Sequence, residues 1–301
     1  MFDEMAELQK KLVDLIGKSI KNEGIITSKI NDLMFFRQNR LTAPGYCMTP
    51  PGVIIVVQGR KQIISGSEVY RYNNTNFLLS SLNIPVSSSV TCASNEKPCL
   101  ALFLKMDIKI ITELISLEKT PFINKINLDD CNNIALGNLT SKILDPFKRL
   151  IMLLDEPDAI STMAPMIIRE IHYRLLMTEQ SAMLRNIVNL ERYGRRIANV
   201  INRIIENLSS PLRIDELASL ANMSPPTLYQ NFKKTTKMSP LQYQKLARLN
   251  EARHLMLNDK INVKTVSFKV GYESPSQFNR EYKRLFGVSP KQDVDTLLSK
   301  I

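Results

Sequence analysis

A repeat in the last third of the chain constrains its fold more than any other feature. The segment Ser224 to Pro240 (SPPTLYQNFKKTTKMSP) aligns with Ser274 to Pro290 (SPSQFNREYKRLFGVSP) at a constant offset of 50 residues. In each copy a Ser that can cap a helix precedes a Pro suited to the first turn, apolar residues recur four residues apart, and the copy ends at Ser-Pro. The repeat therefore predicts two similar short helices.

Another short amphipathic helix precedes each copy, in IDELASLANMS and in VKTVSFKVGYES. Small Ala218 and Ser267 occur where a close crossing of two helices needs a small side chain, and Gly271 can adopt the positive φ of a turn. Helix, tight turn and helix is the helix-turn-helix arrangement, whose second helix enters the major groove of DNA. Between the copies, PLQYQKLARLNEARHLML predicts a linker helix of about 27 Å, somewhat shorter than the ~34 Å between successive major-groove openings.

The net charge of the chain lies mainly in the third that contains the repeat. Residues 195–293 carry 17 Lys and Arg against 8 Asp and Glu, whereas residues 1–194 carry 22 against 20. Contacts from Lys and Arg to phosphates supply most of the non-specific affinity for nucleic acid, so this excess favours a nucleic-acid partner. A solvated basic surface would give the same count, and charge alone leaves both interpretations open.

The pattern of apolar residues changes twice in the first two thirds of the chain. After an apolar stripe at helical spacing in residues 7–20, short runs rich in Val, Ile, Phe and Tyr alternate with turn residues from 25 to 106. About seven short strands, roughly ten residues apart, predict a small antiparallel sandwich or barrel. From 108 to 191 apolar residues recur every three or four positions, which predicts helices only.

We therefore expect an α+β fold of two domains with a helical connector. Residues 1–106 would form an N-terminal helix and a β-rich domain for sensing or dimerisation, and residues 107–190 the connector. Residues 191–301 would form an all-α double helix-turn-helix domain joined by the linker helix.

Two parts of the chain resemble a known family. VGYESPSQFNREYKRLFGVSP, with a Gly in its turn, Phe278 and Tyr282 four residues apart and a terminal Gly-x-Ser-Pro, resembles the DNA-binding domain of AraC/XylS-type transcriptional regulators, over residues 197–293. YCMTPPGVIIVVQGRKQIISGSEVYRY and LDEPDAISTMAPMIIREIHYRLLM are similar to the N-terminal domain of the YqhC-like subgroup, over residues 30–190. The resemblance implies a cupin-like β domain, helices and a sequence-specific DNA-binding domain. Ser267 replaces the more usual Ala.

The candidate DNA contacts are the outward positions of the two repeat helices, because Leu228, Phe232, Phe278 and Tyr282 are expected to anchor those helices in the core. The candidates for base contact are Pro226, Tyr229, Gln230, Ser276, Gln277, Asn279 and Arg280. Gln can pair with adenine, Arg can pair with guanine or grip a phosphate, and Tyr or Pro can touch a thymine methyl. The candidates for phosphate contact, one turn further along, are Lys233, Lys234, Lys283 and Arg284. A solvated polar surface is the alternative for each single residue.

No cofactor or metal is expected. The chain has no glycine-rich phosphate loop, no CxxC pair, and only two histidines, 82 residues apart, with none in residues 25–106. Catalysis and a catalytic cupin metal site are therefore not expected. Cys47, Cys92, Cys99 and Cys131 are expected to be free thiols, and sensing by modification of the first three is a weaker hypothesis than simple burial. No apolar run approaches the ~20 residues that span a bilayer, so we expect a cytoplasmic protein.

The sequence thus predicts a transcription regulator, not an enzyme, whose partners are double-stranded DNA, a small-molecule effector of unknown identity bound in the N-terminal domain, RNA polymerase and a second copy of the chain. Dimerisation is suggested by apolar residues of the helical segment 140–185, although packing on the β domain explains the same pattern. These residues are Leu144, Phe147, Leu150, Ile151, Leu154, Met166, Ile167, Ile171, Leu175 and Leu176. Two alternatives stay open: a cupin-type ligand-binding protein or enzyme with an accessory DNA-binding tail, and an architectural DNA-binding protein without a ligand.

Overall fold

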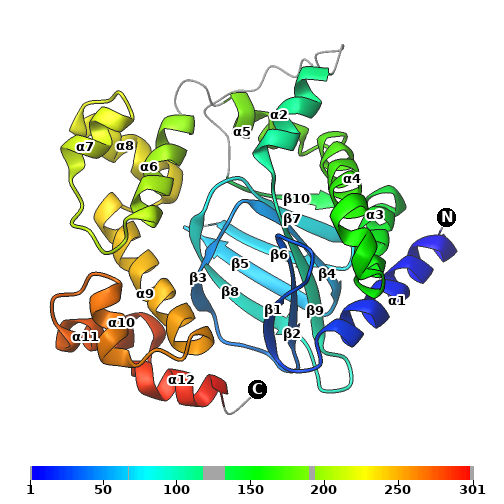
Figure 1. Ribbon diagram of the computed structural model, residues 1–301, viewed down its shortest axis with the longest axis horizontal. Coiled ribbons are helices and arrows are strands. Elements are labelled where there is room, and N and C mark those ends of the chain that lie inside the picture. Colours follow the sequence, from blue (N-terminus) through cyan, green and yellow to red (C-terminus); the bar gives the residue numbers. More distant parts are fainter. Residues whose placement is uncertain (1, 67, 118–132, 190–193, 299–301) are drawn as a thin grey trace.

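The structure is a computed structural model that describes residues 2–66, 68–117, 133–189 and 194–298 (Figure 1). It has two domains, a β-rich one with a helical cover and an all-helical one, so the predicted α+β fold is confirmed. The N-terminal elements are α1 (Phe2–Ser19), β1 (Gly24–Thr27), β2 (Leu33–Gln38), β3 (Gly45–Thr49), β4 (Gly52–Gln58), β5 (Arg60–Ser65), β6 (Glu68–Asn73), β7 (Asn76–Ser80), β8 (Ile84–Cys92), β9 (Cys99–Lys105), α2 (Ile108–Leu117), β10 (Ile134–Asn138), α3 (Ser141–Met152), the 3-10 helix η2 (Leu153–Asp155), α4 (Pro157–Leu176) and α5 (Ser181–Asn189). The C-terminal elements are α6 (Gly194–Glu206), α7 (Ile214–Leu220), α8 (Pro225–Thr236), α9 (Pro240–Asn258), α10 (Val263–Lys269), α11 (Pro275–Phe286) and α12 (Pro290–Leu298).

The β domain consists of two antiparallel sheets, with strand orders β1-β2-β9-β4-β7-β10 and β3-β8-β5-β6. Both faces of the larger sheet are buried, which explains apolar runs such as GVIIVV in β4. Val53 and Ile55 belong to the core shared with the helices, whereas Val56 belongs to the core shared with the smaller sheet. The strand alternation thus separates a helix-facing core from the interior between the two sheets.

Helices cover the outer face of the larger sheet, where α1, α3 and α4 pack (Figure 1). Of the ten apolar residues that suggested dimerisation, eight lie in this core: Leu144, Phe147, Leu150, Ile151, Ile167, Ile171, Leu175 and Leu176. Packing on the β domain therefore accounts for them. Leu154 is partly buried against the same core, and Met166 is 63% exposed.

The expectation of helices alone between residues 108 and 191 is wrong at Ile134–Asn138. These residues form β10, which pairs with β7 at the edge of the larger sheet. Gly137 lies opposite Phe77 there, and a Cβ on Gly137 would collide with that ring. The strand is short and follows a stretch without β pattern, so a tertiary pairing rather than local propensity defines it.

The C-terminal domain lies beside the smaller sheet, next to its edge strand β3 and the neighbouring β8 (Figure 1). Tyr243 of α9 donates its hydroxyl hydrogen to the backbone oxygen of Asn83 at 2.7 Å, and the Asn133 side chain donates to the oxygen of Thr235 at 2.6 Å. Apolar residues of α6 to α9 belong to the same buried cluster as the interior between the sheets. The two domains therefore share a core.

Candidate DNA-binding surface

Both copies of the repeat form a helix-turn-helix, which we call unit 1 (residues 214–236, α7 and α8) and unit 2 (residues 263–286, α10 and α11). As predicted, Ser224 and Ser274 cap the second helix of each unit, where each side chain accepts a backbone hydrogen bond. The helices end in the left-handed conformation, at Lys237 with φ 63° and at Gly287 with φ 80°. Gly is the usual residue there, and the lysine in unit 1 is the less favourable choice.

The turn inside each unit has the same hydrogen bond. The Met223 amide donates to the oxygen of Ala218 and the Tyr272 amide to the oxygen of Ser267, both at 2.9 Å. Ala218 is 2% exposed and Ser267 is fully buried, so both are in the close helix crossing predicted for small residues. Because the Ser267 hydroxyl donates to Lys264 O at 2.7 Å, serine is satisfied there in place of alanine.

The predicted anchors of the two second helices are buried. Leu228, Phe232, Phe278 and Tyr282 are each fully inaccessible to solvent. Phe232 packs edge-on against Tyr243 of the linker helix with ring centroids 5.5 Å apart, whereas in unit 2 Phe278 and Tyr282 pack on each other at 5.5 Å. These contacts fix which face of α8 and of α11 points away from the protein.

The outward faces of α8 and α11 carry every candidate contact residue. All eleven are exposed: Pro226, Tyr229, Gln230, Lys233, Lys234, Ser276, Gln277, Asn279, Arg280, Lys283 and Arg284. Those of α8 recur three and four residues apart, which places them along one side of the helix. The structure therefore brings these residues together as two exposed faces, one for each unit.

Glu281 organises the outward face of α11. Its carboxylate accepts hydrogen bonds from the Tyr272 hydroxyl at 3.0 Å and the Gln277 amide at 3.3 Å, and pairs with Lys245 of α9 at 3.2 Å. These donors hold the pKa of Glu281 below its usual range despite partial burial, which alone would raise it. The Gln277 side chain is thus oriented before any DNA is bound.

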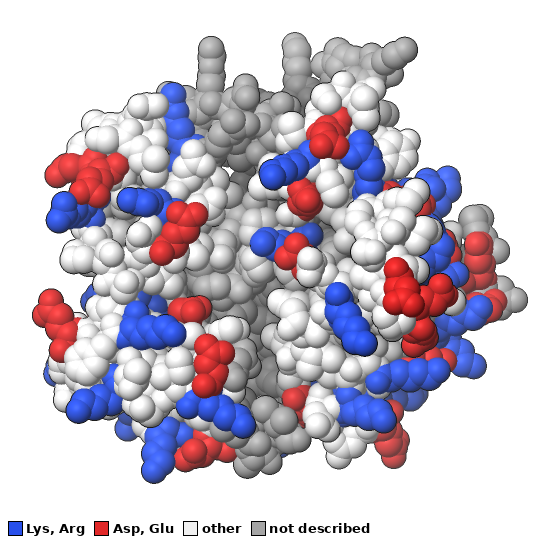
Figure 2. All heavy atoms as spheres, viewed as in Figure 1, with Lys and Arg blue, Asp and Glu red and all other residues white. Residues whose placement is uncertain are grey.

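Charge on the visible face of the C-terminal domain is mixed. Figure 2 shows Lys and Arg interspersed with Asp and Glu over the C-terminal helices at its left. The excess of basic residues in this domain does not form one continuous patch on that face.

Comparison with known proteins identifies the family. A family model described as the AraC-type transcriptional regulator N-terminus matches residues 29–183, and one described as a helix-turn-helix domain matches residues 217–294. The chain is an AraC-type transcriptional regulator with a helix-turn-helix DNA-binding domain. The resemblance to AraC/XylS-type regulators is confirmed.

Relatives along most of the regulator's length support this assignment. The virulence regulon transcriptional activator VirF of Yersinia enterocolitica is 22% identical over 244 residues, which are 80% of this chain and 88% of VirF. The regulator also has the fold of ToxT from Vibrio cholerae. An apo form of a ToxT variant matches with a TM-score of 0.65 and 9% identity over 89% of this chain and 98% of ToxT. Wild-type ToxT with an unsaturated fatty acid bound matches with a TM-score of 0.58 and 9% identity over 89% and 97%.

A group of polar side chains lies between the two sheets of the regulator. Lys61 of β5 and Tyr72 of β6 are directly opposite in the strand pairing, and the Lys61 ammonium lies 3.7 Å from the ring centroid of Phe36 on the other sheet. Burial lowers the pKa of Lys61, and burial raises the pKa of Tyr72 far above its ordinary value. The Tyr72 hydroxyl is buried without a hydrogen-bond partner, which is costly for a phenol.

The thiols near this group are not activated. Burial raises the pKa of Cys47 and raises the pKa of Cys99 to about 11, and the nearby Lys61 opposes both shifts only in part. Cys92 is exposed. Because the thiolate is the reactive form, Cys47 and Cys99 are neutral near pH 7. Only Cys99 is fully buried, since Cys47 is half-buried, and Cys131 lies outside the described residues.

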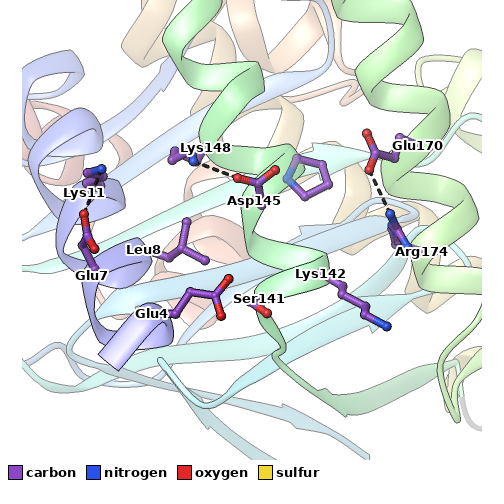
Figure 3. A pocket seen from close by; sticks show the side chains of 11 residues that line it. Glu4, Glu7, Leu8, Lys11, Ser141, Lys142, Asp145, Lys148, Glu170 and Arg174 are labelled. Atoms are coloured by element: carbon purple, nitrogen blue, oxygen red, sulfur yellow. Dashed lines mark hydrogen bonds and ion pairs between the residues drawn. The ribbon is translucent and has the colours of Figure 1, made fainter. Parts of the chain in front are cut away.

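The regulator also has a surface cleft of about 410 Å³ between α1, α3 and α4 (Figure 3). Four acidic and four basic side chains line it: Glu4, Glu7, Asp145, Glu170, Lys11, Lys142, Lys148 and Arg174. Several are already paired with each other, for example Lys148 with Asp145 at 2.7 Å. This balance favours neither an anion nor a cation.

Among the described residues no helix is long and apolar enough to cross a membrane, and no group of three or more His, Cys, Asp or Glu side chains could hold a metal.

Sequence reasoning missed two functional candidates, Arg248 and Lys61. Arg248 of α9 donates hydrogen bonds to the backbone oxygens of Leu208, Ser210 and Gly271, and such acceptors leave no trace in the sequence. Lys61 could have been noticed, because it stands two residues before buried Ile63 and so shares its inward face in the strand.

Proposed function

We propose that this regulator reads two successive major-groove segments of double-stranded DNA, one with α8 and one with α11. The proposal rests on the two faces of each helix. The apolar anchors on one face are fully buried, and every candidate contact residue on the other face is exposed. Bases would be contacted by Pro226, Tyr229, Gln230, Ser276, Gln277, Asn279 and Arg280, and phosphates by Lys233, Lys234, Lys283 and Arg284.

Selection of bound sequences from a random duplex pool tests this function. The full-length chain, at fixed physiological salt, is expected to enrich a motif in two parts about one helical turn apart. The variant Gln277→Ala should relax the preference at one position of one part. If nothing is enriched, binding is indifferent to sequence, and the architectural alternative replaces sequence-specific regulation.

We propose further that an amphipathic organic acid is the effector, with its carboxylate held by Lys61 and Tyr72 between the sheets. A carboxylate would give the Lys61 ammonium a counter-charge and the Tyr72 hydroxyl an acceptor, while the apolar cluster around them would receive the chain of the acid. The fatty acid bound by ToxT, a protein of the same fold, has this chemistry.

Thermal unfolding with a long-chain unsaturated fatty acid tests this site. At a concentration of 100 times Kd the ligand should stabilise the regulator by about 2.7 kcal/mol, visible as a rise in Tm. Lys61→Met should abolish the rise, and Lys97→Met, which removes an exposed lysine, should keep it. An equal rise in the Lys61 variant would show that the acid binds elsewhere.

Four finer points remain proposals. The division proposed at 106/107 lies between the end of β9 at Lys105 and the start of α2 at Ile108, and the segment that follows it contributes β10 to the larger sheet and α3 and α4 to its helical cover. The division proposed at 190/191 lies outside the described residues. Dimerisation would use the exposed apolar residues of α4, among them Met163, Met166 and Tyr173, and sedimentation of a Met166→Glu variant tests it. RNA polymerase is a proposed partner, and the cytoplasm is the proposed location.

A further inference from the structure

The side chain of Arg248, in the linker helix α9, joins the two helix-turn-helix units. Its Nε donates to the oxygen of Leu208 at 2.6 Å, its Nη2 to the oxygen of Ser210 at 3.0 Å, and its Nη1 to the oxygen of Gly271 at 2.8 Å. Leu208 and Ser210 lie in the loop between α6 and α7, which leads into unit 1, and Gly271 is in the turn of unit 2. The guanidinium therefore bridges the loop that leads into unit 1 and the turn of unit 2.

The two backbones approach closely at this bridge. Gly271 has φ of +90°, and a Cβ added there would lie 2.5 Å from the backbone oxygen and 2.6 Å from the Cα of Ser209. Glycine is required for both reasons. Gln244, one turn before Arg248 in α9, donates to the oxygen of Ser210 at 2.9 Å and so holds the same loop. The contact is a packed joint of three segments.

Arginine suits this joint better than any other residue. Its planar fork carries five N–H donors, so it can serve three carbonyl oxygens in different directions, whereas a lysine ammonium is a compact point donor. The carbonyls are neutral, and a negative charge nearby is supplied by Glu281 of α11, which pairs with Lys245 of α9. The geometry of the guanidinium is therefore satisfied at the joint, whereas burial lowers the pKa of Arg248 and Glu281 opposes this shift only in part.

A linker helix alone does not fix how the units face each other. The 19 residues of α9 span about 28 Å, but loops connect it to α8 at one end and to α10 at the other. Unit 1 packs on the first half of α9 through Tyr243 and Ala247, and unit 2 packs on the second half through Leu249 and Met256. Because these two cores are separate, the relative orientation of the units also depends on contacts that join them directly, and the Arg248 bridge is such a contact.

We propose that Arg248 is a positioning residue that fixes the separation and orientation of α8 and α11, and thereby sets the spacing between the two DNA half-sites that the regulator accepts. The inference rests on the proposed reading of DNA by both helices. Adding one base pair between the half-sites moves one of them by about 3.4 Å and rotates it by roughly 34°. Rigidly joined units cannot follow this change, whereas loosely joined units can.

The test measures spacing discrimination with the duplex motif selected by the full-length chain. Affinity is compared between this duplex and duplexes with one base pair inserted or removed between the two parts, at fixed salt. The unaltered regulator should lose roughly 10- to 100-fold, because one helix loses its base contacts. Arg248→Met, which keeps the aliphatic stem, should lose less than about 3-fold, since its units can adjust to the altered spacing. A duplex with only one part of the motif should bind both proteins equally, which shows that each unit is folded.

Two further variants keep the test decisive. Arg213→Met also removes one arginine, but its side chain bonds to Glu216 within unit 1, so spacing discrimination should stay as in the unaltered chain. Gly271→Ala leaves the Arg248 side chain intact and forces the joint open, so discrimination should fall or the preferred spacing should change.

Undiminished discrimination in Arg248→Met would overturn the proposal. If Arg248→Met no longer folds, undiminished discrimination in Gly271→Ala overturns it instead. Failure of the unaltered chain to select any motif in two parts would refute the proposed function itself, which is a different outcome.

Discussion

Arg280→Ala and Lys283→Ala should weaken DNA binding in two different ways, although both remove one positive charge from α11. Lys283 is proposed to contact a phosphate, and each such contact contributes about −0.9 to the slope of log affinity against log salt. The four proposed phosphate contacts on α8 and α11 then contribute about −3.6. Removing Lys283 should reduce the steepness by about 0.9 for every duplex, so the loss of affinity between 50 and 200 mM salt becomes roughly 3.5-fold smaller.

Arg280 is proposed to contact a base, so its removal should depend on sequence. The expected cost is about 1 to 3 kcal/mol on the selected duplex, or roughly 5- to 150-fold in affinity. On a duplex in which the contacted base pair is replaced, the cost should largely vanish, because the contact is already lost. Fluorescence anisotropy with the selected duplex and its single-pair variants, each at 50, 100 and 200 mM salt, measures both effects.

The assignment of Arg280 to a base contact and of Lys283 to a phosphate contact is wrong if the two variants behave alike. A change of slope without any change of sequence preference in Arg280→Ala would make Arg280 a phosphate contact. A sequence-dependent loss in Lys283→Ala would mean that α11 is rotated about its axis in the complex relative to our assignment. Lys97→Met, which removes an exposed lysine of the β domain, is the charge-matched control and should change neither quantity.

Three further predictions concern stability. Tyr243→Phe removes the hydrogen bond to Asn83 that joins the domains, and denaturant unfolding should show a loss of about 1 kcal/mol; no loss would mean that water replaces the bond fully. Tyr282→Phe removes a buried hydrogen bond to the Asp293 carboxylate, which also pairs with Arg253, and should cost about 1.5 to 3 kcal/mol in the same assay, whereas an unchanged midpoint would contradict it. His172 is held neutral, because its Nε2 accepts from the Asp107 amide at 2.9 Å, and burial lowers its pKa below the ordinary value of 6.5. The His172 pKa is higher in the unfolded chain than in the folded one, so the unfolded chain is protonated at a higher pH. The free energy of unfolding should therefore fall as pH drops below about 6.5, by about 1.4 kcal/mol for each unit by which the two pKa values differ. In His172→Asn this part of the pH dependence should be absent.

The repeat allowed most of the DNA-binding domain to be predicted. Caps at Ser224 and Ser274, anchors at Phe232 and Phe278, and the outward faces all follow from local rules of helix formation and from one periodicity. The β domain was predicted at the level of its apolar strands. The edge strands β1, β3 and β10 were missed, because they are short and their pairing partners define them.

Contacts between distant segments could not be predicted in the same way. The joint at Arg248 connects residues 23 to 40 positions apart, and carbonyl oxygens, which every residue has, leave no trace in the sequence. The apolar residues of segment 140–185 were ambiguous for a related reason. Periodicity shows that a helix has a buried face, but not whether another domain or another copy of the chain covers it.

The shared core gives a physical reason why effector and DNA sites could influence each other. One buried cluster contains Tyr72 of the proposed effector site and Cys99 near it, together with Phe232 of α8 and Tyr243 of α9, which pack on each other. Close-packed interiors transmit changes of volume, so an acid that enters between the sheets would act on the support of α8 through direct packing. Unit 2 has a separate core around Phe278 and Tyr282, and is connected to this cluster through α9 and the Arg248 joint. An effector would therefore change the packing of unit 1 directly. A change in unit 2 would depend on how rigidly the Arg248 joint connects the two units.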